Sequence, residues 1–192
     1  MRLPESWTER IPALEQLEEP WEPFPRIALF AWIAFYLFFL NQQARHGMLP
    51  GLMDGVFVPI HEGGHLLFRI AGEFLMIAGG TFLQLFAPFA LATYFAFRRQ
   101  PQGVAFCSFF FFQQFLPIST YMADARDRAL PLVTLGAEAD DPNIGHDWNY
   151  IFDHLGLLEH DRQIGHFTHY VAVTGSFAVV AWLVYRWRQS SE

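Results

Sequence analysis

The stretch FLMIAGGTFLQLFAPFALATYFAF (residues 74–97) contains no charged side chain. A helix needs about 20 consecutive, mostly apolar residues to cross a bilayer, so this stretch alone is long enough. Residues 48–68 are also long enough, although they carry Asp54 and Glu62. Three further uncharged stretches lie at residues 27–40, 104–123 and 170–185. The sequence therefore predicts an all-α integral membrane protein with about five transmembrane helices, whose two termini would lie on opposite sides of the membrane.

The composition supports a multi-pass membrane protein and excludes one class of partner. Hydrophobic residues make up 53% of the chain, and they are gathered in long blocks rather than at amphipathic spacing. The formal net charge is −7, whereas binding to nucleic acid depends on clustered basic side chains. We therefore expect a lipid bilayer around the chain, that of a bacterial or archaeal cytoplasmic membrane, and no nucleic acid as a partner.

Four regions follow from the distribution of apolar and polar residues. They are an acidic, Pro-rich arm (1–23), a membrane core with four spans (24–123), a polar loop rich in His and Asp (124–165), and the fifth span with the C-terminal tail (166–192). The arm lacks the positive start and the adjacent apolar segment of a secretory signal, so we expect it to be retained. Within the polar loop, HDWNYIFDHLGLLEH (146–160) has the pattern of a short amphipathic helix.

The segment RIAGEFLMIAGG (69–80) lies between the second and third predicted spans and leaves two interpretations open. Its glycines are compatible with a simple helical turn. They are equally compatible with a short extended or re-entrant piece, which is tolerated at membrane depth only where it is buried in protein or lines a cavity.

The second predicted span contains the sequence HEGGH, residues 61–65. Ionisable side chains inside a membrane cost at least about 2.5 kcal/mol at the helix centre, so they need a partner such as a metal ion. Residues four apart lie on the same face of a helix, so His61 and His65 can ligate one ion. Glu62 lies to the side, where its carboxylate can act as a general base toward a metal-activated water. Gly63 and Gly64 are costly inside a helix, and close approach of another backbone would explain them.

This motif resembles the active helix of the site-2 protease family of intramembrane zinc metalloproteases. The resemblance covers roughly residues 50–130, and HExxH is its one strong motif. It implies a Zn²⁺ cofactor, a membrane-anchored peptide or protein as substrate, and substrate contacts at Gly63, Gly64 and Gln84. The segment AGGTFLQ (78–84) is only partly similar to the family's Ala-Gly-Pro segment, because Gly80 stands where the family has Pro.

A catalytic zinc takes three protein ligands, so a third must come from outside the second span. Asp124 is the preferred residue, because it ends an uncharged span and is the first carboxylate that another helix offers. The family resemblance points to the same residue, although Ala125 stands where the family has Gly. The less favoured ligands are Asp127, Glu73 and His146, the last of which would require the polar loop to fold back toward the membrane.

Two other functions remain open at this stage. The chain could be a metal-binding but catalytically silent subunit that works with membrane-protein partners. It could also be a membrane di-iron oxygenase or desaturase, since further histidines follow at positions 154, 160, 166 and 169. However, Glu62 beside His61 is needed for hydrolysis and is unexplained by a cluster of histidines. We therefore expect a zinc metalloprotease, with Glu62 as the catalytic residue and His61, His65 and Asp124 as the metal ligands.

Overall fold

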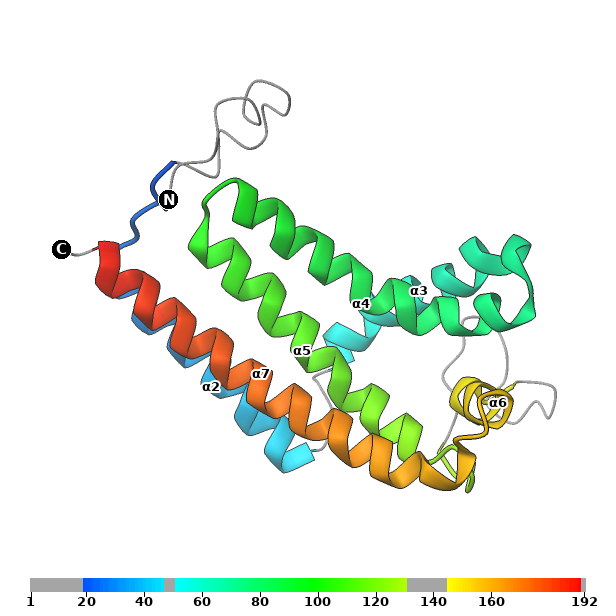
Figure 1. Cartoon of the computed structure of the whole chain (residues 1–192). Helices are drawn as coiled ribbons and strands as arrows, with labels where there is room; N and C mark the ends of the chain where they lie inside the picture. The colour runs from blue at the N-terminus through cyan, green and yellow to red at the C-terminus, as the bar shows by residue number, and fades with distance from the viewer. Residues whose placement is uncertain (1–18, 47–50, 131–144, 191–192) are drawn as a thin grey trace.

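The computed structural model describes residues 19–46, 51–130 and 145–190, and all regular secondary structure in this part of the chain is helical (Figure 1). Most of the acidic arm and the turn-forming sequence EADDPNI (138–144) lie outside these residues. The helices are α2 (Arg26–His46), α3 (Gly51–Phe68), the 3-10 turn η2 (Arg69–Ala71), α4 (Glu73–Phe97), α5 (Pro101–Ala123), α6 (Asp147–His154), the 3-10 turn η3 (Leu158–His160) and α7 (Asp161–Ser190).

Three helical segments are long and apolar enough to cross a membrane: Glu73–Phe97, Pro101–Ala123 and Leu158–Ser190. They contain the third, fourth and fifth spans that the sequence predicts. The first predicted span forms only a shorter apolar stretch, Arg26–Gln42. The second, α3, is not among the three, since its central residues include His61, Glu62 and His65. Five spans are therefore not confirmed.

Many large apolar side chains lie on the outside of the helices. Leu66 is 71% exposed, Ile70 97%, Phe89 54% and Phe177 57%. Exposed apolar area on this scale is unusual for a soluble monomer, in which contiguous apolar patches stay small. It suits helices whose outer faces contact hydrocarbon.

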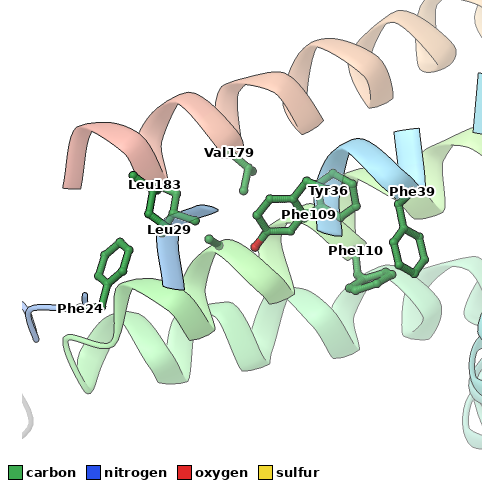
Figure 2. Close-up of a cluster of buried hydrophobic side chains, with 9 residues drawn as sticks. Phe24, Leu29, Tyr36, Phe39, Phe109, Phe110, Val179 and Leu183 are labelled. Carbon is green, nitrogen blue, oxygen red and sulfur yellow. The ribbon is translucent and has the colours of Figure 1, made fainter. Parts of the chain in front are cut away.

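The main core lies where α2, α5 and α7 meet, and aromatic rings dominate it (Figure 2). Tyr36 of α2 packs on Phe109 of α5 with 4.5 Å between ring centroids, and both side chains are 0% exposed. From α7, Val179 and Leu183 belong to the same buried cluster, and Leu183 is also fully buried (Figure 2). These contacts connect α2 and α7 to the first half of α5.

Contacts between helices define their directions. In α2, Trp32 bonds to Gln102 and Phe39 packs on Phe110, so α2 runs in the same direction as α5. The chain reverses in the short turn between α4 and α5, so α4 is antiparallel to α5. Because α3 precedes α4 across a short turn and is antiparallel to it, α3 also runs in the same direction as α5 and α2.

The shared direction of α2 and α3 gives no support to two separate consecutive crossings by these helices. The extreme termini, whose opposite placement the sequence predicts, lie outside the described residues, but the described segment before α2 lies beside the end of α7. Trp21, just before α2, lies 5.5 Å from the ring of Trp182 near the end of α7, with Arg186 over its face at 4.8 Å.

The segment after α3 is a short helical turn rather than an extended piece. The 3-10 turn η2 is followed by Gly72, and α4 then runs without interruption from Glu73. Gly79 and Gly80 are therefore inside α4, where they serve helix packing. The close contacts that Gly79 and Gly80 make with α3 explain why glycine stands at these positions.

The predicted amphipathic helix of the polar loop is present as α6. Its buried residues Ile151 and Phe152 form a second small core with Ala125, which directly follows the end of α5. The start of α4 contributes Phe74 and Ile77 to the same contact. This second core holds α6 against the ends of α4 and α5, far from the end of the bundle where α7 finishes (Figure 1).

Candidate metal centre

His61 and His65 lie one turn apart on α3, as the spacing predicts, and their rings converge. The ring centroids are 4.7 Å apart, and the two Nε2 atoms are separated by 3.1 Å. Both side chains are only partly accessible, at 18% and 23%. The pair faces α4 rather than open lipid.

The approach of α4 to this pair depends on glycines on both helices. A Cβ on Gly64 would overlap the backbone carbonyl of Gly79, so the two helices are closer here than a side chain would permit. A Cβ on Gly80 would stand 2.6 Å from Nε2 of His65 and 2.7 Å from Nε2 of His61. Gly80 therefore leaves free the space toward which both Nε2 atoms point. The expected close backbone approach is confirmed at Gly64, whereas Gly63 meets nothing nearer than Leu83 Cδ2 at 3.9 Å.

Hydrogen bonds at the Nδ1 atoms determine which nitrogen of each ring is free. Nδ1 of His65 lies 2.9 Å from the backbone carbonyl of Met76, which can only accept, so this Nδ1 carries the hydrogen. Nδ1 of His61 lies 3.0 Å from Oε1 of Gln84, whose amide in turn donates to Oε1 of Gln114 at 2.7 Å. With each Nδ1 engaged in this way, Nε2 is the nitrogen left to face Asp147, and without its proton it is the atom that can bind a metal.

The third group that joins the histidines is Asp147, the first residue of α6. Its Oδ2 lies 3.1 Å from Nε2 of His61 and 3.4 Å from Nε2 of His65, and its side chain is 13% exposed. Burial opposes ionisation of this carboxyl, but hydrogen bonds with His61 and His65 outweigh burial and lower its pKa. Asp147 is therefore an ionised oxygen donor directed at two nitrogen donors.

The geometry of these three atoms matches a zinc site. Zinc is bound at about 2.0–2.1 Å by His nitrogen and by carboxylate oxygen, which puts tetrahedral ligand atoms about 3.3 Å apart. The three separations here are 3.1, 3.1 and 3.4 Å. Among the residues that the structure describes, His61, His65 and Asp147 are the one group of metal-capable side chains close enough to share an ion. Two His and one carboxylate also leave a fourth position for water.

Two further side chains border the three ligand groups. Glu62 is half-buried beside His61 and forms no hydrogen bond or ion pair with another described residue, so its carboxylate remains available. The hydroxyl of Tyr121 on α5 accepts a hydrogen bond from the backbone N–H of Asp147 at 3.2 Å. This bond ties the start of α6 to α5 at the level of the site.

The structure does not bring Asp124 to the histidine pair. Its two oxygens accept the backbone N–H groups of Ala129 and Leu130, each at 3.0 Å, so it caps the turn after α5. His146 is likewise used locally, since its Nδ1 accepts from the backbone N–H of Asn149 and caps α6. Burial lowers the pKa of His146, against the opposing charge of Asp124, whose Oδ2 is 3.5 Å from Nε2.

The remaining predicted residues occupy other places. Asp127 pairs with Arg162 at 2.8 Å on the surface, and Glu73 lies exposed in the first turn of α4. Gln84 contacts His61 rather than an open surface. The late histidines provide no ligand to the described group: His154 packs on Phe74, His160 lies by Gln163, and the side chains at 166 and 169 are exposed.

Sequence reasoning missed Asp147. The chain at His146 does return to the histidine pair, as a ligand at His146 would have required, but the oxygen that faces the pair belongs to the neighbouring residue, Asp147. One signal was present in the sequence: Asp147 is a carboxylate in the first turn of the predicted amphipathic helix, and a helix holds its first residues in a defined position. Nothing local, however, indicates that this helix docks beside α3.

Comparisons of the chain with protein-family models, with curated proteins and with solved structures find no match.

Proposed function

We propose that this protein is a multi-pass membrane zinc metalloprotease that hydrolyses a peptide bond in or near a membrane-anchored substrate. The observation that carries the proposal is the convergence of Nε2 of His61, Nε2 of His65 and Oδ2 of Asp147 within 3.1–3.4 Å of one another. The Nδ1 contacts of both histidines, which leave Nε2 as the nitrogen that faces Asp147, and the clearance at Gly80 support it. Asp147 replaces Asp124 as the proposed third ligand.

The chain's own residues divide the chemistry between them. A zinc ion held by His61, His65 and Asp147 would polarise the substrate carbonyl and lower the pKa of a bound water to about 7. Glu62 accepts a proton from the water as its oxygen adds to the carbonyl carbon. Glu62 then gives that proton to the amine nitrogen as the carbon–nitrogen bond breaks.

The position of the site in α4 favours a substrate in the membrane. Gly80 lies about 11 Å from the start of α4, at 1.5 Å per residue, so the ligand atoms are inside the apolar helices rather than beyond their ends. A peptide bond reaches this depth only in a chain that enters the bilayer. The partial exposure of the histidines and of Glu62 provides the access that such a substrate requires.

Glu62→Gln tests the assignment of a hydrolase. The amide keeps the size of the side chain but cannot accept the proton, so cleavage of a membrane-anchored reporter should fall by roughly 100-fold or more. Zinc content should stay at the wild-type level, since Glu62 is not a ligand. Exposed Asp153 of α6, changed to Asn, is the control and should leave both quantities unchanged.

The same experiment separates the hydrolase from a catalytically silent metal-binding subunit. Wild-type protein that binds zinc but cleaves no membrane-anchored reporter, with no difference from Glu62→Gln, would favour the silent subunit. Loss of zinc in Glu62→Gln would instead make this residue a ligand and contradict its role as a base.

A further inference from the structure

Two buried glutamines connect the candidate metal centre to the middle of α5. Gln84 of α4 is 9% exposed and Gln114 of α5 is 1% exposed, so both side chains are buried. They bond to each other, Nε2 of Gln84 to Oε1 of Gln114, at 2.7 Å. Buried amides are costly unless they are paired, so this pair needs a reason to be present in an apolar bundle.

The hydrogen bonds of the pair run in one direction. Oε1 of Gln114 accepts from the Nε2 hydrogen of Gln84, which leaves Oε1 of Gln84 facing Nδ1 of His61 at 3.0 Å. In this orientation Gln84 can only accept from His61, so the ring hydrogen is held on Nδ1 and the lone pair on Nε2. A reversed Gln84 amide would donate to Nδ1 and would put the ring hydrogen on the nitrogen that faces Asp147.

Gln114 favours this orientation of Gln84, because its Oε1 accepts the Gln84 hydrogen. Its own Nε2 is buried and has no hydrogen-bond partner among the described residues. The one described contact that its amide makes is the acceptance of the Gln84 hydrogen. Gln114 therefore accepts this hydrogen bond only while Gln84 keeps its Oε1 toward Nδ1 of His61.

We propose that Gln114 is a positioning residue for the metal centre, which acts through Gln84 to hold His61 in its metal-binding tautomer. The inference rests on the proposed function, because it assumes that His61 ligates a metal. It means that α5, a helix that supplies none of the proposed ligands, helps to set the tautomer of His61. Outer-shell partners of ligating histidines typically contribute 10–100-fold to metal affinity.

The adjacent residue provides a matched control. Gln113 is also fully buried on α5, but its Nε2 donates to Ser176 of α7 at 2.9 Å and it has no contact with the site. Gln114→Met and Gln113→Met both replace a buried amide with an apolar side chain of similar length. We expect Gln114→Met to weaken binding of Co²⁺ by about 10-fold or more, read from its visible absorption, and Gln113→Met to leave it near wild type.

A double-mutant cycle supplies the second measurement. If Gln114 acts only through Gln84, then Gln114→Met should have no further effect on Co²⁺ affinity in a Gln84→Leu background. Gln114→Glu keeps an oxygen for the Gln84 amide and should keep wild-type affinity. Equal losses in Gln114→Met and Gln113→Met, or additive losses in the cycle, would overturn the inference. Failure of wild-type protein to bind Co²⁺ at all would instead refute the proposed function.

Discussion

At the scale of single residues, Gly80 shows how a position without a side chain shapes the candidate metal centre. It belongs to α4 and offers no donor atom, yet it borders Nε2 of both His61 and His65. We predict that Gly80→Ala lowers zinc affinity by at least about 10-fold, because the added methyl group would stand within 2.7 Å of each ligating nitrogen. Isothermal titration of metal-free protein measures this directly.

Gly63→Ala is the control for that substitution. Gly63 lies on α3 between the same histidines, but a Cβ there meets only Leu83 Cδ2 at 3.9 Å, an ordinary contact distance. Its zinc affinity should remain near wild type. Equal zinc affinity in the Gly80→Ala and wild-type proteins would show that the two nitrogens do not share this space.

At the scale of elements, α6 matters because its first residue is the proposed third ligand and its packing sets where that residue lies. Ile151 is 6% exposed in the small core that joins α6 to the ends of α4 and α5. We predict that Ile151→Ala loosens this docking by about 2–4 kcal/mol and weakens zinc binding, while the α5–α7 contact persists. Hydrogen exchange should show loss of protection in α6 alone.

Leu155, one turn beyond, gives the comparison. It is also aliphatic but is 53% exposed, so Leu155→Ala removes little packing and should change neither protection nor zinc affinity. If Ile151→Ala left zinc affinity unchanged although α6 lost its protection, Asp147 would not depend on α6 docking. The third ligand would then have to come from another element.

At the scale of the whole molecule, the helix directions favour an even number of membrane crossings. The segment before α2 meets the end of α7, through Trp21 with Trp182 and Arg186. We predict that cysteines introduced at Glu22 and Gln189, in a Cys107→Ala background, react with a membrane-impermeant reagent from the same side. A cysteine at Asp153 should react from the opposite side, because α6 lies at the other end of the bundle (Figure 1).

Labelling of Glu22 and Gln189 positions from opposite sides would restore the five-span topology. It would also contradict the contact between Trp21 and α7, so the two observations test each other.

The parts of this architecture that the sequence predicts are those determined by local pattern. Uncharged stretches predict α4, α5 and α7, and the four-residue spacing predicts that His61 and His65 face one point. The direction of α2 and α3 was not predictable in this way, because it depends on aromatic and glycine contacts between distant helices. Asp147 belongs to the same class, since 86 residues separate it from His61 and only tertiary packing brings them together.

The central claim is that a metal is held by residues from α3 and α6 rather than by α3 and the end of α5. Zinc content of protein purified by the same procedure, measured by mass spectrometry for wild type, Asp147→Ala and Asp124→Ala, tests it most directly. We predict about one zinc per chain in wild type, a sharp loss in Asp147→Ala, and retention in Asp124→Ala, whose lost bonds are to the turn at Ala129 and Leu130. Zinc retained in Asp147→Ala and lost in Asp124→Ala, or absent from wild type, would contradict the account.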